Sequence, residues 1–542
     1  MIKKIYELLT RQQRKRSIGV VISVLMRAVL DFAGVAALVP VLFTVLGPGD
    51  SKNTMLLLCG AVLLFIMLKN AFVLLLARAQ SSYQLEIYRS VSRRMFANYY
   101  RRGLLFLKAK SSVQLGYEVN YVCYMFSLSV LAPLFRIAGE AVLILMMLTA
   151  LIVWEPLSGL LLCAVFFPMA GLYVGVVRKR LRLYGEEELE ARRKQSRTVV
   201  EAFRGYPELE IAQAFHTSLS RFDQGMDFIV HNRLRMEVYQ LFPSFLSEVA
   251  VVAGLALLIG TGHGELGVVS GVFAVAAFRL IPAVRSILNS WVTLQNASHT
   301  IAVVEDGIAD ESQHVANDEP PFVFKNNIEL RDLAFSFADG HELFAHLNLT
   351  INRGERIGIR GASGSGKSTL FNLLLGFYSP TAGQISIDGR PLTLANRSEW
   401  HKLVGYVPQE IFIIEGSLVD NIALGQPNPD REKVLHVLEQ VQLKEWLAEL
   451  PQGLDTSLGE YGSRLSGGQK QRIGIARALY KEAEVLFFDE ATSALDNRTE
   501  QEINQALQSL SDQHHELTLI VIAHRESSLA FCNRVFDLDK EI

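Results

Sequence analysis

Six long apolar stretches dominate the first part of the chain. They cover residues 18–46, 55–77, 121–154, 157–177, 241–260 and 268–292. Each provides the roughly 20 residues that a helix needs to cross a bilayer, and several are longer, which predicts helices that continue into water. Six buried helices in succession fit poorly into a soluble core. The pattern therefore predicts a multi-pass α-helical membrane domain with six transmembrane helices.

The charges between these stretches predict their orientation. The short connections at residues 47–54, 154–156 and 261–267 contain one basic residue between them, whereas the N-terminus and the connections at 78–110 and 178–235 are rich in Arg and Lys. The positive-inside rule places the N-terminus and both long connections in the cytoplasm. Good helix formers in the long connections predict cytoplasmic extensions of the membrane helices. The first apolar stretch is too long for a cleavable signal peptide, so we expect it to be retained.

The character of the chain changes at about Glu305. Residues 305–321 are acidic and polar and end in two prolines, which is typical of a linker. Beyond them, short β-branched runs alternate with helical segments, as in an α/β domain. The expected organisation is a transmembrane domain at 1–304, a linker at 305–325 and an α/β domain at 326–542.

Composition adds two exclusions. Half of the 542 residues are hydrophobic, which suits a membrane protein, and the formal net charge of −2 gives no reason to expect nucleic acid as a partner. The four cysteines have no CxxC spacing, so we expect neither a disulfide framework nor a zinc site.

Charged residues also occur inside the apolar stretches. Arg27 and Asp31 are four positions apart, as are Arg136 and Glu140, which puts each pair on one helix face. We expect both pairs to neutralise themselves and fix helix packing, with contact to a substrate as the alternative.

Other charged residues in these stretches have no such neighbour. Arg279 and Arg285 lack an obvious local partner, which makes them candidates for contact with an anionic substrate. The alternative is that their long side chains reach the cytoplasmic interface.

A glycine-rich segment of the α/β domain predicts nucleotide binding. The sequence GASGSGKST matches G-x-x-x-x-G-K-[ST], follows the strand-like run ERIGIR and precedes the helix-like run TLFNLLLGF. Its backbone amides can surround phosphates, Lys367 can reach the β- and γ-phosphates, and Ser368 can place its hydroxyl on Mg²⁺. The phosphate-binding loop comprises Gly361, Ala362, Ser363, Gly364, Ser365, Gly366, Lys367, Ser368 and Thr369.

Two acids follow a second hydrophobic strand, EVLFFDE. Asp489 suits a Mg²⁺ ligand that acts through water, and Glu490 beside it can polarise the attacking water as a general base. The pair is informative because the phosphate-binding loop accompanies it.

The sequence LSGGQKQR offers a second surface for phosphate, because a serine and two glycines precede a helix. With VPQ at Gln409, SALD ending at Asp496 and AHR containing His524, in this order, the chain resembles the ATP-binding cassette (ABC) transporter family. The six apolar stretches with two long connections resemble the family's exporter half-transporters. The signature residues are Ser466, Gly467, Gly468 and Gln469.

This resemblance implies that two cassettes dimerise head to tail. ATP would lie between the Lys367 loop of one chain and residues 466–469 of the other, and Asp496 would cross the interface. A second half-transporter chain is therefore required. Both halves of the ATP site are present in this chain, so we expect an identical partner.

The resemblance also implies chemical roles. Glu490 would activate water and His524 would contact the γ-phosphate. Ser368, Gln409 and Asp489 would hold Mg²⁺, and Gln409 would report to the membrane domain. The segments LFLKAKSSVQLGY and EAFRGYPELEIAQAF correspond to the coupling helices that dock on the cassette.

One departure concerns adenine. Phe337 in FSF stands where the family usually has a tyrosine that stacks on the base. The aromatic ring is retained, so stacking is still expected.

Two further segments bear on the substrate. DFAGVAALVPVLF and AAFRLIPAVRSILNS are similar to exporters that flip lipid-linked oligosaccharides, although residues 47–54 are too short for the extra helix that those flippases can carry. Arginine suits a diphosphate, and Arg279, Arg285 and Arg136 are available to hold one. The expected function is ATP-driven export or flipping of a lipid-like molecule across a bacterial-type cytoplasmic membrane, most of all a lipid-linked oligosaccharide or related glycolipid.

Several alternatives remain. An exporter of lipid A or drugs would need a mainly apolar cavity, and a peptide exporter is less favoured because we expect no peptidase domain. The apolar stretches argue against a soluble mechanical ATPase. Glu490 and His524 favour a cycling pump over an ATP-gated channel.

Overall fold

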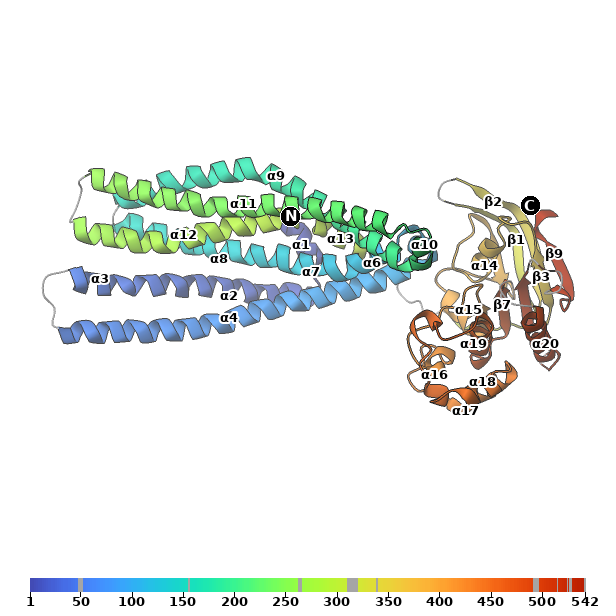
Figure 1. Cartoon of the computed structure of the whole chain (residues 1–542). Helices are drawn as coiled ribbons and strands as arrows, with labels where there is room; N and C mark the ends of the chain where they lie inside the picture. The colour runs from blue at the N-terminus through green and yellow to red at the C-terminus, as the bar shows by residue number, and fades with distance from the viewer. Residues whose placement is uncertain are drawn as a thin grey trace. The chain divides into compact units, whose positions relative to one another are not determined.

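The computed structural model describes residues 1–46, 52–154, 156–261, 266–309, 320–337, 340–490, 497–513, 515–523, 525 and 529–540. The chain divides into two compact units. The first comprises residues 1–102 and 106–311, and the second comprises residues 312–542 with Gly103–Leu105. Each unit has its own hydrophobic core (Figure 1).

The first unit is built of helices. Its α-helices are α1 (Ile2–Leu8), α2 (Arg11–Ala36), α3 (Leu38–Leu46), α4 (Lys52–Arg101), α5 (Gly103–Ala109), α6 (Ser112–Tyr117), α7 (Cys123–Met125), α8 (Ala132–Trp154), α9 (Pro156–Arg204), α10 (Tyr206–Ile211), α11 (Phe215–Thr261), α12 (Leu266–Asn296) and α13 (His299–Ile308). Two π-helical turns, Glu118–Val122 and Phe126–Leu131, lie between α6 and α8. The last helix, α13, extends into the stretch expected to be a linker.

The longest helices exceed the thickness of a bilayer. Helix α4 has 50 residues, which at 1.5 Å per residue is about 75 Å, against a hydrocarbon core of about 30 Å. Helices α9 and α11 have 49 and 47 residues and pack against each other. These three helices are therefore longer than one membrane crossing needs, in agreement with the predicted cytoplasmic extensions, and the short helix α10 connects α9 to α11.

The helix of the first apolar stretch has one interruption. Helix α2 ends at Ala36 and α3 begins at Leu38, while Ala37 between them keeps helical backbone angles (φ −64°, ψ −19°), so Arg11–Val41 remains one candidate membrane span. Pro40 has no N–H group to donate to the carbonyl of Ala36, four positions earlier, so a continuous helix would lose this hydrogen bond. The break at Ala37 follows from that loss.

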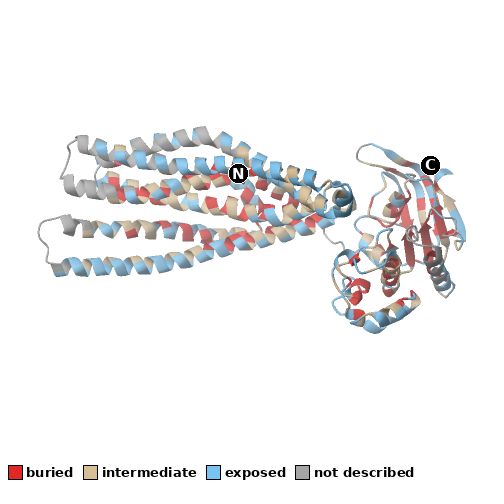
Figure 2. Ribbon diagram, in the orientation of Figure 1, coloured by how far each residue is buried: buried red, intermediate tan, exposed pale blue. Residues whose placement is uncertain are grey.

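Three segments of the described chain are long and apolar enough to cross a membrane: Arg11–Val41, Met55–Arg101 and Ser112–Trp154. The other three predicted spans fall on α9, α11 and α12, where many side chains lie outside the described residues. Figure 2 shows that the apolar part of α4 is largely exposed. Leu56 and Leu74, for example, are 79% and 71% exposed, as expected of side chains that face lipid.

The second unit is an α/β domain with two sheets. The antiparallel sheet has the order β2-β1-β4-β5, and the parallel sheet has the order β6-β7-β8-β3-β9. The strands are β1 (Asn327–Ser336), β2 (Glu342–Asn352), β3 (Arg356–Arg360), β4 (Ala382–Ile387), β5 (Arg390–Pro391), β6 (Val404–Val407), β7 (Val485–Asp489), β8 (Thr518–Ile522) and β9 (Arg534–Asp537). The helices are α14 (Lys367–Leu374), α15 (Arg397–Leu403), α16 (Leu418–Ile422), α17 (Arg431–Gln440), α18 (Lys444–Glu449), α19 (Gly467–Tyr480) and α20 (Asn497–Gln513).

The parallel sheet places the candidate chemistry at one edge. All five residues of β7 and of β8 are buried, which is typical of parallel strands covered on both faces. The carboxyl ends of β3, β7 and β8 lie together, and in open α/β sheets this edge is where ligands bind. The sequence prediction of an α/β domain is confirmed.

Candidate ATP-hydrolysis site and membrane charge cluster

The phosphate-binding loop connects β3 to α14 and depends on glycine conformations. Gly364 and Gly366 have φ angles of +88° and +92°, in the left-handed region that side chains disfavour. A Cβ atom on Gly366 would also lie 2.8 Å from Cδ2 of Leu343, which is too close. Both glycines are therefore required for the tight turn into α14.

Lys367 is held at the mouth of this loop. Its Nζ donates to the backbone oxygens of Gly361 (2.9 Å) and Ala362 (2.7 Å), and the residue is 5% exposed. Asp539 fixes the loop from the far end of the chain, because its Oδ2 accepts a hydrogen bond from Ala362 N at 2.8 Å. The Ser365 hydroxyl is buried without a partner among the described residues. A held cation and an unpartnered hydroxyl fit a polyphosphate.

The other loop residues surround this centre. Ser363 is exposed on the turn, and Ser368 and Thr369 lie on the first turn of α14. The exposed Ser368 is available to a metal ion bound with the nucleotide.

Asp489 ends β7 as expected and is 8% exposed. The hydroxyl of Tyr406 donates to its Oδ2 at 3.4 Å. Burial, and then the charge of Asp489, raise the pKa of Tyr406, so the phenol remains a protonated donor at neutral pH.

Glu490 is placed by an unusual backbone. Its φ angle is +49°, a conformation that costs about 1–3 kcal/mol for a residue other than glycine. Its backbone N–H donates to the oxygen of Ile522 on β8 (2.9 Å), and its Oε2 accepts a hydrogen bond from Nε2 of Gln409 (3.1 Å). The structure thus brings together two candidate residues that are 81 positions apart in sequence.

The Gln409 segment is fixed by a residue that the sequence reading did not single out. Gln471, on α19, donates from Nε2 to the backbone oxygen of Gln409 at 2.9 Å. Gln471 belongs to the string LSGGQKQR, so the helix that begins at the signature also positions Gln409.

The signature residues form the start of α19. The Ser466 hydroxyl accepts a hydrogen bond from Gln469 N (3.2 Å), and the Gln469 side chain accepts one from Ser466 N (2.8 Å), which is a capping box. Ser466 and Gly467 are exposed, and Gly468 is half-buried. An exposed helix N-terminus of this kind can receive an anion from outside the domain.

The candidate adenine contact, Phe337, is half-buried at the end of β1. Its ring meets Phe335 edge-on, with centroids 5.0 Å apart, and Phe335 stacks on Tyr378 at 5.6 Å. The contact with Phe335 holds the Phe337 ring in place, and the ring can stack on a base.

Two candidates, His524 and Asp496, lie outside the described residues. The register of the sheet pairs Asp489 with Ile522, the last residue of β8, and His524 follows two positions later in sequence.

In the membrane region, Asp31 is the centre of a charge cluster. Its carboxylate lies 2.9 Å from Lys69 Nζ, 3.2 Å from Arg279 Nη2 and 4.0 Å from Arg27 Nε. The predicted Arg27–Asp31 pair is therefore present but is the longest of the three contacts. Arg279, which has no local partner in sequence, is paired with Asp31 of another helix. Lys69 was missed, although a lysine inside an apolar stretch is itself a signal.

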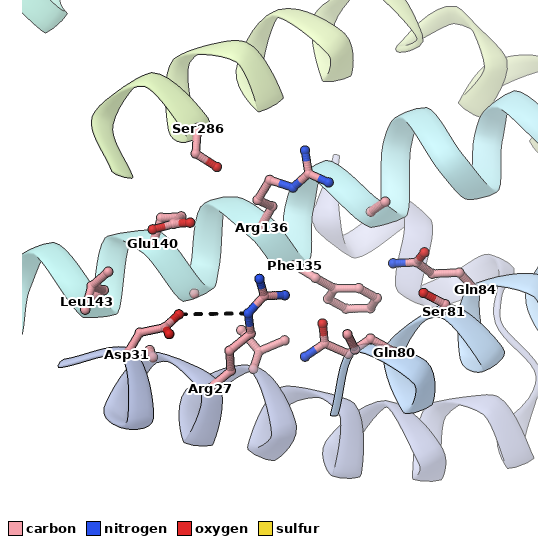
Figure 3. Close-up of a pocket in the computed structure, with 15 residues that line it drawn as sticks. Arg27, Asp31, Gln80, Ser81, Gln84, Phe135, Arg136, Glu140, Leu143 and Ser286 are labelled. Carbon is pink, nitrogen blue, oxygen red and sulfur yellow. Dashed lines mark ion pairs between the residues drawn. The ribbon is translucent and has the colours of Figure 1, made fainter. Parts of the chain in front are cut away.

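The second expected pair is absent. No ion pair joins Arg136 to Glu140 among the described residues, and Glu140 Oε2 is buried without a hydrogen-bond partner. Figure 3 shows the Arg136 guanidinium directed away from Glu140. This corrects the prediction: residues four apart share a helix face, but the exposed Arg136 turns away from the half-buried Glu140. Arg285, on α12, is exposed and has no ion pair in the described part of the chain.

A family model described as "ABC transporter" matches residues 344–493, which include the phosphate-binding loop, Gln409, the signature and Glu490. Among curated proteins, the chain is 30% identical over 389 residues to the "ATP-dependent lipid A-core flippase" of Burkholderia pseudomallei (strain 1710b), covering 70% of this chain and 64% of the relative. The protein of the same description from Francisella tularensis subsp. holarctica (strain OSU18) is 32% identical over 393 residues, covering 69% and 62%. The chain thus spans slightly less than two thirds of these relatives.

A solved structure described as "Structure of a bacterial Atm1-family ABC exporter with ATP bound" matches with a TM-score of 0.78 at 25% identity, covering 97% of this chain and 94% of the other. The comparisons confirm the resemblance stated from the sequence. The chain has the fold of an ABC exporter, with a helical transmembrane region followed by an ABC domain. Within that class it is similar to exporter-type half-transporters, including proteins described as lipid A-core flippases.

Proposed function

We propose that this chain is one half of an ABC exporter that hydrolyses ATP to flip a lipid-like molecule across the cytoplasmic membrane. The observation that carries the proposal is the presence, in one chain, of membrane-length helices and of a site with Lys367, Gln409 and Glu490 in place. In this proposal residues 1–304 form six transmembrane helices, 305–325 the linker and 326–542 the cassette. The N-terminus and the cassette are cytoplasmic.

The residues of the site support a hydrolytic reaction. Lys367 and the loop amides would bind the phosphates of ATP. Ser368, Gln409 and Asp489 would hold Mg²⁺, which neutralises phosphate charge when bound. Glu490, held by the amide of Gln409 at 3.1 Å, is the general base for water. His524 and Asp496 keep their proposed roles at the γ-phosphate and the dimer interface.

The sheet order supports a dimer. Helix α14, which carries Lys367, follows β3, whereas α19, which begins after Ser466, packs against β6. In the sheet, β7 and β8 separate β6 from β3. At about 4.8 Å per strand, that is a spacing of about 14 Å. Because these strands are so far apart, a second chain is the natural source of the signature for each nucleotide, and we propose that it is identical.

For the cargo we propose a glycolipid. Both curated relatives are described as flippases of a lipid A-core, which favours the lipid A alternative over a lipid-linked oligosaccharide. Both cargoes join sugars to a lipid. Arg279 is engaged by Asp31, so Arg136 and Arg285 are the proposed substrate arginines that have no ion pair among the described residues.

Reconstitution tests the cargo. The purified chain in liposomes should hydrolyse ATP, and lipid A or an undecaprenyl-diphosphate oligosaccharide should stimulate that rate more than phosphatidylglycerol does. Equal rates with all three lipids would contradict a glycolipid cargo.

The general base has its own test. Glu490→Gln should lower turnover by about 100- to 10,000-fold while ATP binding is retained. The matched control is Glu439→Gln, on the surface of α17, which should leave turnover unchanged. Undiminished hydrolysis in Glu490→Gln would remove Glu490 from this role.

A further inference from the structure

Glu118 is a buried carboxylate that joins α4 to α6 in the helical unit. The residue is 3% exposed. The hydroxyl of Tyr99 donates to its Oε2 at 2.6 Å, and Nε2 of Gln114 donates to its Oε1 at 2.8 Å. Taking a carboxylate out of water is costly, and an apolar residue of similar volume is often at least as stabilising. The charge of Glu118 therefore points to a role other than stability.

The backbone at Glu118 is also unusual. Glu118 begins the π-helical turn Glu118–Val122, and a second such turn follows at Phe126–Leu131. Single π-helical turns inside α-helices are rare and occur frequently at functional sites. This observation does not depend on the charge of Glu118, yet it points to the same residue.

The cation that Glu118 faces is Lys110, which directly follows α5. Lys110 Nζ lies 3.7 Å from Glu118 Oε2 and 3.8 Å from Asp306 Oδ2. It also lies over the rings of Tyr99 and Phe106, 5.6 Å and 5.2 Å from their centroids, where an ammonium group is attracted. Because Asp306 belongs to α13, one ammonium group connects the end of α5 both to α13 and to the first π-helical turn.

The two carboxylates that share Lys110 differ in how firmly they are held. Glu118 accepts two short hydrogen bonds, and 4% of its side chain is exposed. Asp306 has 60% of its side chain exposed, and a second ion pair, to Arg102, is 3.6 Å long. Ion pairs at an exposed carboxylate are weak. The contact between Lys110 and Asp306 can therefore open and close at little cost, while Glu118 keeps Lys110 nearby.

Helix α13 packs closely on α4. Nδ2 of Asn98, on α4, donates to the backbone oxygens of Gly307 (2.9 Å) and Ala309 (2.7 Å). A Cβ atom on Gly307 would lie 2.5 Å from Cε of Met95, which leaves no room for a side chain between the two helices. A displacement of α13 therefore involves α4, which contains one of the candidate membrane spans.

Lys110 and Asp306 lie close in sequence to the two places where the chain enters its second compact unit. Gly103–Leu105 belong to that unit, and the chain enters it again at residue 312. Lys110 is also part of LFLKAKSSVQLGY, a segment whose resemblance to a coupling helix implies docking on a cassette. A side chain that connects α5 to α13 is thus placed to pass a displacement of α5 on to the membrane helices.

We propose that Lys110, held by Glu118, is the positioning residue through which a displacement of α5 reaches α13 when nucleotide binds to the cassette. A lysine suits this role because its long, flexible side chain and three donors can keep one carboxylate while the other moves. The inference rests on the proposed ATP-driven transport and applies to any cargo, because Lys110 acts without touching the cargo.

Backbone hydrogen exchange in the full chain tests the proposal. The protein in lipid nanodiscs is compared without nucleotide and with saturating AMP-PNP and Mg²⁺, and exchange is followed by mass spectrometry. In the parent, the nucleotide should change exchange both in residues 103–110 and in α13. Lys110→Met removes the charge and should reduce the nucleotide-dependent change in α13 about fivefold, the size of effect that one partly exposed ion pair gives. The change in residues 103–110 should remain.

Three further variants separate transmission from folding. Lys110→Arg keeps a cation and should restore the parent response of α13. Glu118→Gln removes the charge that holds Lys110 and should reproduce the loss. Glu305→Gln is the matched control on α13, because Glu305 pairs with Lys4 at 2.7 Å, and it should respond as the parent does.

Two results would overturn the proposal. One is a nucleotide-dependent change in α13 that is as large in Lys110→Met as in the parent, even if exchange is faster throughout, because Lys110 would then have a purely structural role. The other is a parent in which α13 does not respond to the nucleotide. The proposed function fails on a separate measurement, the absence of an ATP-dependent leaflet change by the parent, so the two failures are distinguishable.

Discussion

The cassette and the membrane helices assemble their polar groups differently. In the cassette, the phosphate-binding loop, the pair Asp489–Glu490 and the signature are short contiguous segments at strand or helix ends. In the membrane region, Asp31 pairs with Lys69 and Arg279, which are 38 and 248 positions away. Chemistry in the cassette is therefore visible in sequence, whereas among the helices it exists only after folding.

The difference follows from the surroundings of each group. A carboxylate at the cassette surface can use water or backbone N–H groups, but one inside lipid must find cations on neighbouring helices. Asp31, with 17% of its side chain exposed, has three such cations. Glu86, on a more exposed part of α4 in the same helical unit, has 39% of its side chain exposed and one ion pair, to Arg16, among the described residues.

Removing the cation of the phosphate-binding loop should have the largest effect, a loss of ATP affinity. It tests whether nucleotide binding in the cassette depends on a short local motif. Lys367→Ala removes the point charge that the loop carbonyls hold in place, so ATP affinity should fall about 100-fold. Binding of a fluorescent ATP analogue measures the change. Lys433→Ala is the matched control, because Lys433 pairs with Glu482 away from the loop. Equal affinity losses in the two variants would show that the effect is not specific to the loop.

Breaking the Asp31 cluster tests whether charges buried among the membrane helices stabilise the helical unit more than an exposed ion pair does. Asp31→Asn leaves Lys69 and Arg279 without their counter-ion, which should destabilise the helical unit by about 3 kcal/mol. Glu86→Gln, at an exposed pair, should cost less than about 1 kcal/mol. Thermal unfolding in detergent ranks the two, and adding Lys69→Met to Asp31→Asn should recover part of the loss. Similar losses from both single variants would mean that the membrane cluster behaves as a surface pair.

A smaller effect is expected on the pH dependence of stability, because the cassette also has a buried titratable group, His401. Burial lowers the pKa of His401, outweighing the hydrogen bond between its Nε2 and the oxygen of Leu375 (2.7 Å), and the charges of Arg397 and Lys481 lower it further. The folded state therefore favours neutral His401. The contribution of neutral His401 to the free energy of unfolding is complete above the pKa of about 6.5 that histidine has in the unfolded chain. It is lost as the pH falls through the lower pKa of the folded state, and the free energy of unfolding then changes by at most about 1.4 kcal/mol per pH unit.

Unfolding measured between about pH 7.5 and 5.5 checks this prediction. His401→Gln should flatten the profile, whereas His436→Gln, on the exposed surface of α17, should keep the parent slope. If the free energy of unfolding of His401→Gln changes with pH as steeply as that of the parent, other groups cause the pH dependence.

Particular residues show which parts of the site could be predicted from the sequence. The loop at 361–369 could be predicted because a strand, a turn and a helix in succession define its geometry, and Glu490 because it follows a hydrophobic strand in a chain that contains this loop. Gln409 was expected from the resemblance to the ABC family. Asp539 and Gln471, which hold that geometry, lie outside the motif positions that defined the site, and only the folded chain shows their contacts. The break after Ala36 was available in principle from Pro40.

The membrane region was harder for a physical reason. Helical spacing identifies which residues share a face but not which helix that face meets. Spacing therefore found Arg27–Asp31, gave a wrong pair for Arg136–Glu140, and left the contacts of Glu118 unseen.

In the proposed function, ATP hydrolysis at Glu490 moves a glycolipid between leaflets. Proteoliposomes containing a fluorescent glycolipid, with accessible label quenched from outside, measure this directly. We expect ATP to change the accessible fraction with the parent protein but not with Glu490→Gln. An ATP-dependent change of equal size in Glu490→Gln, or steady ATP turnover by the parent with no change in the accessible fraction, would contradict it.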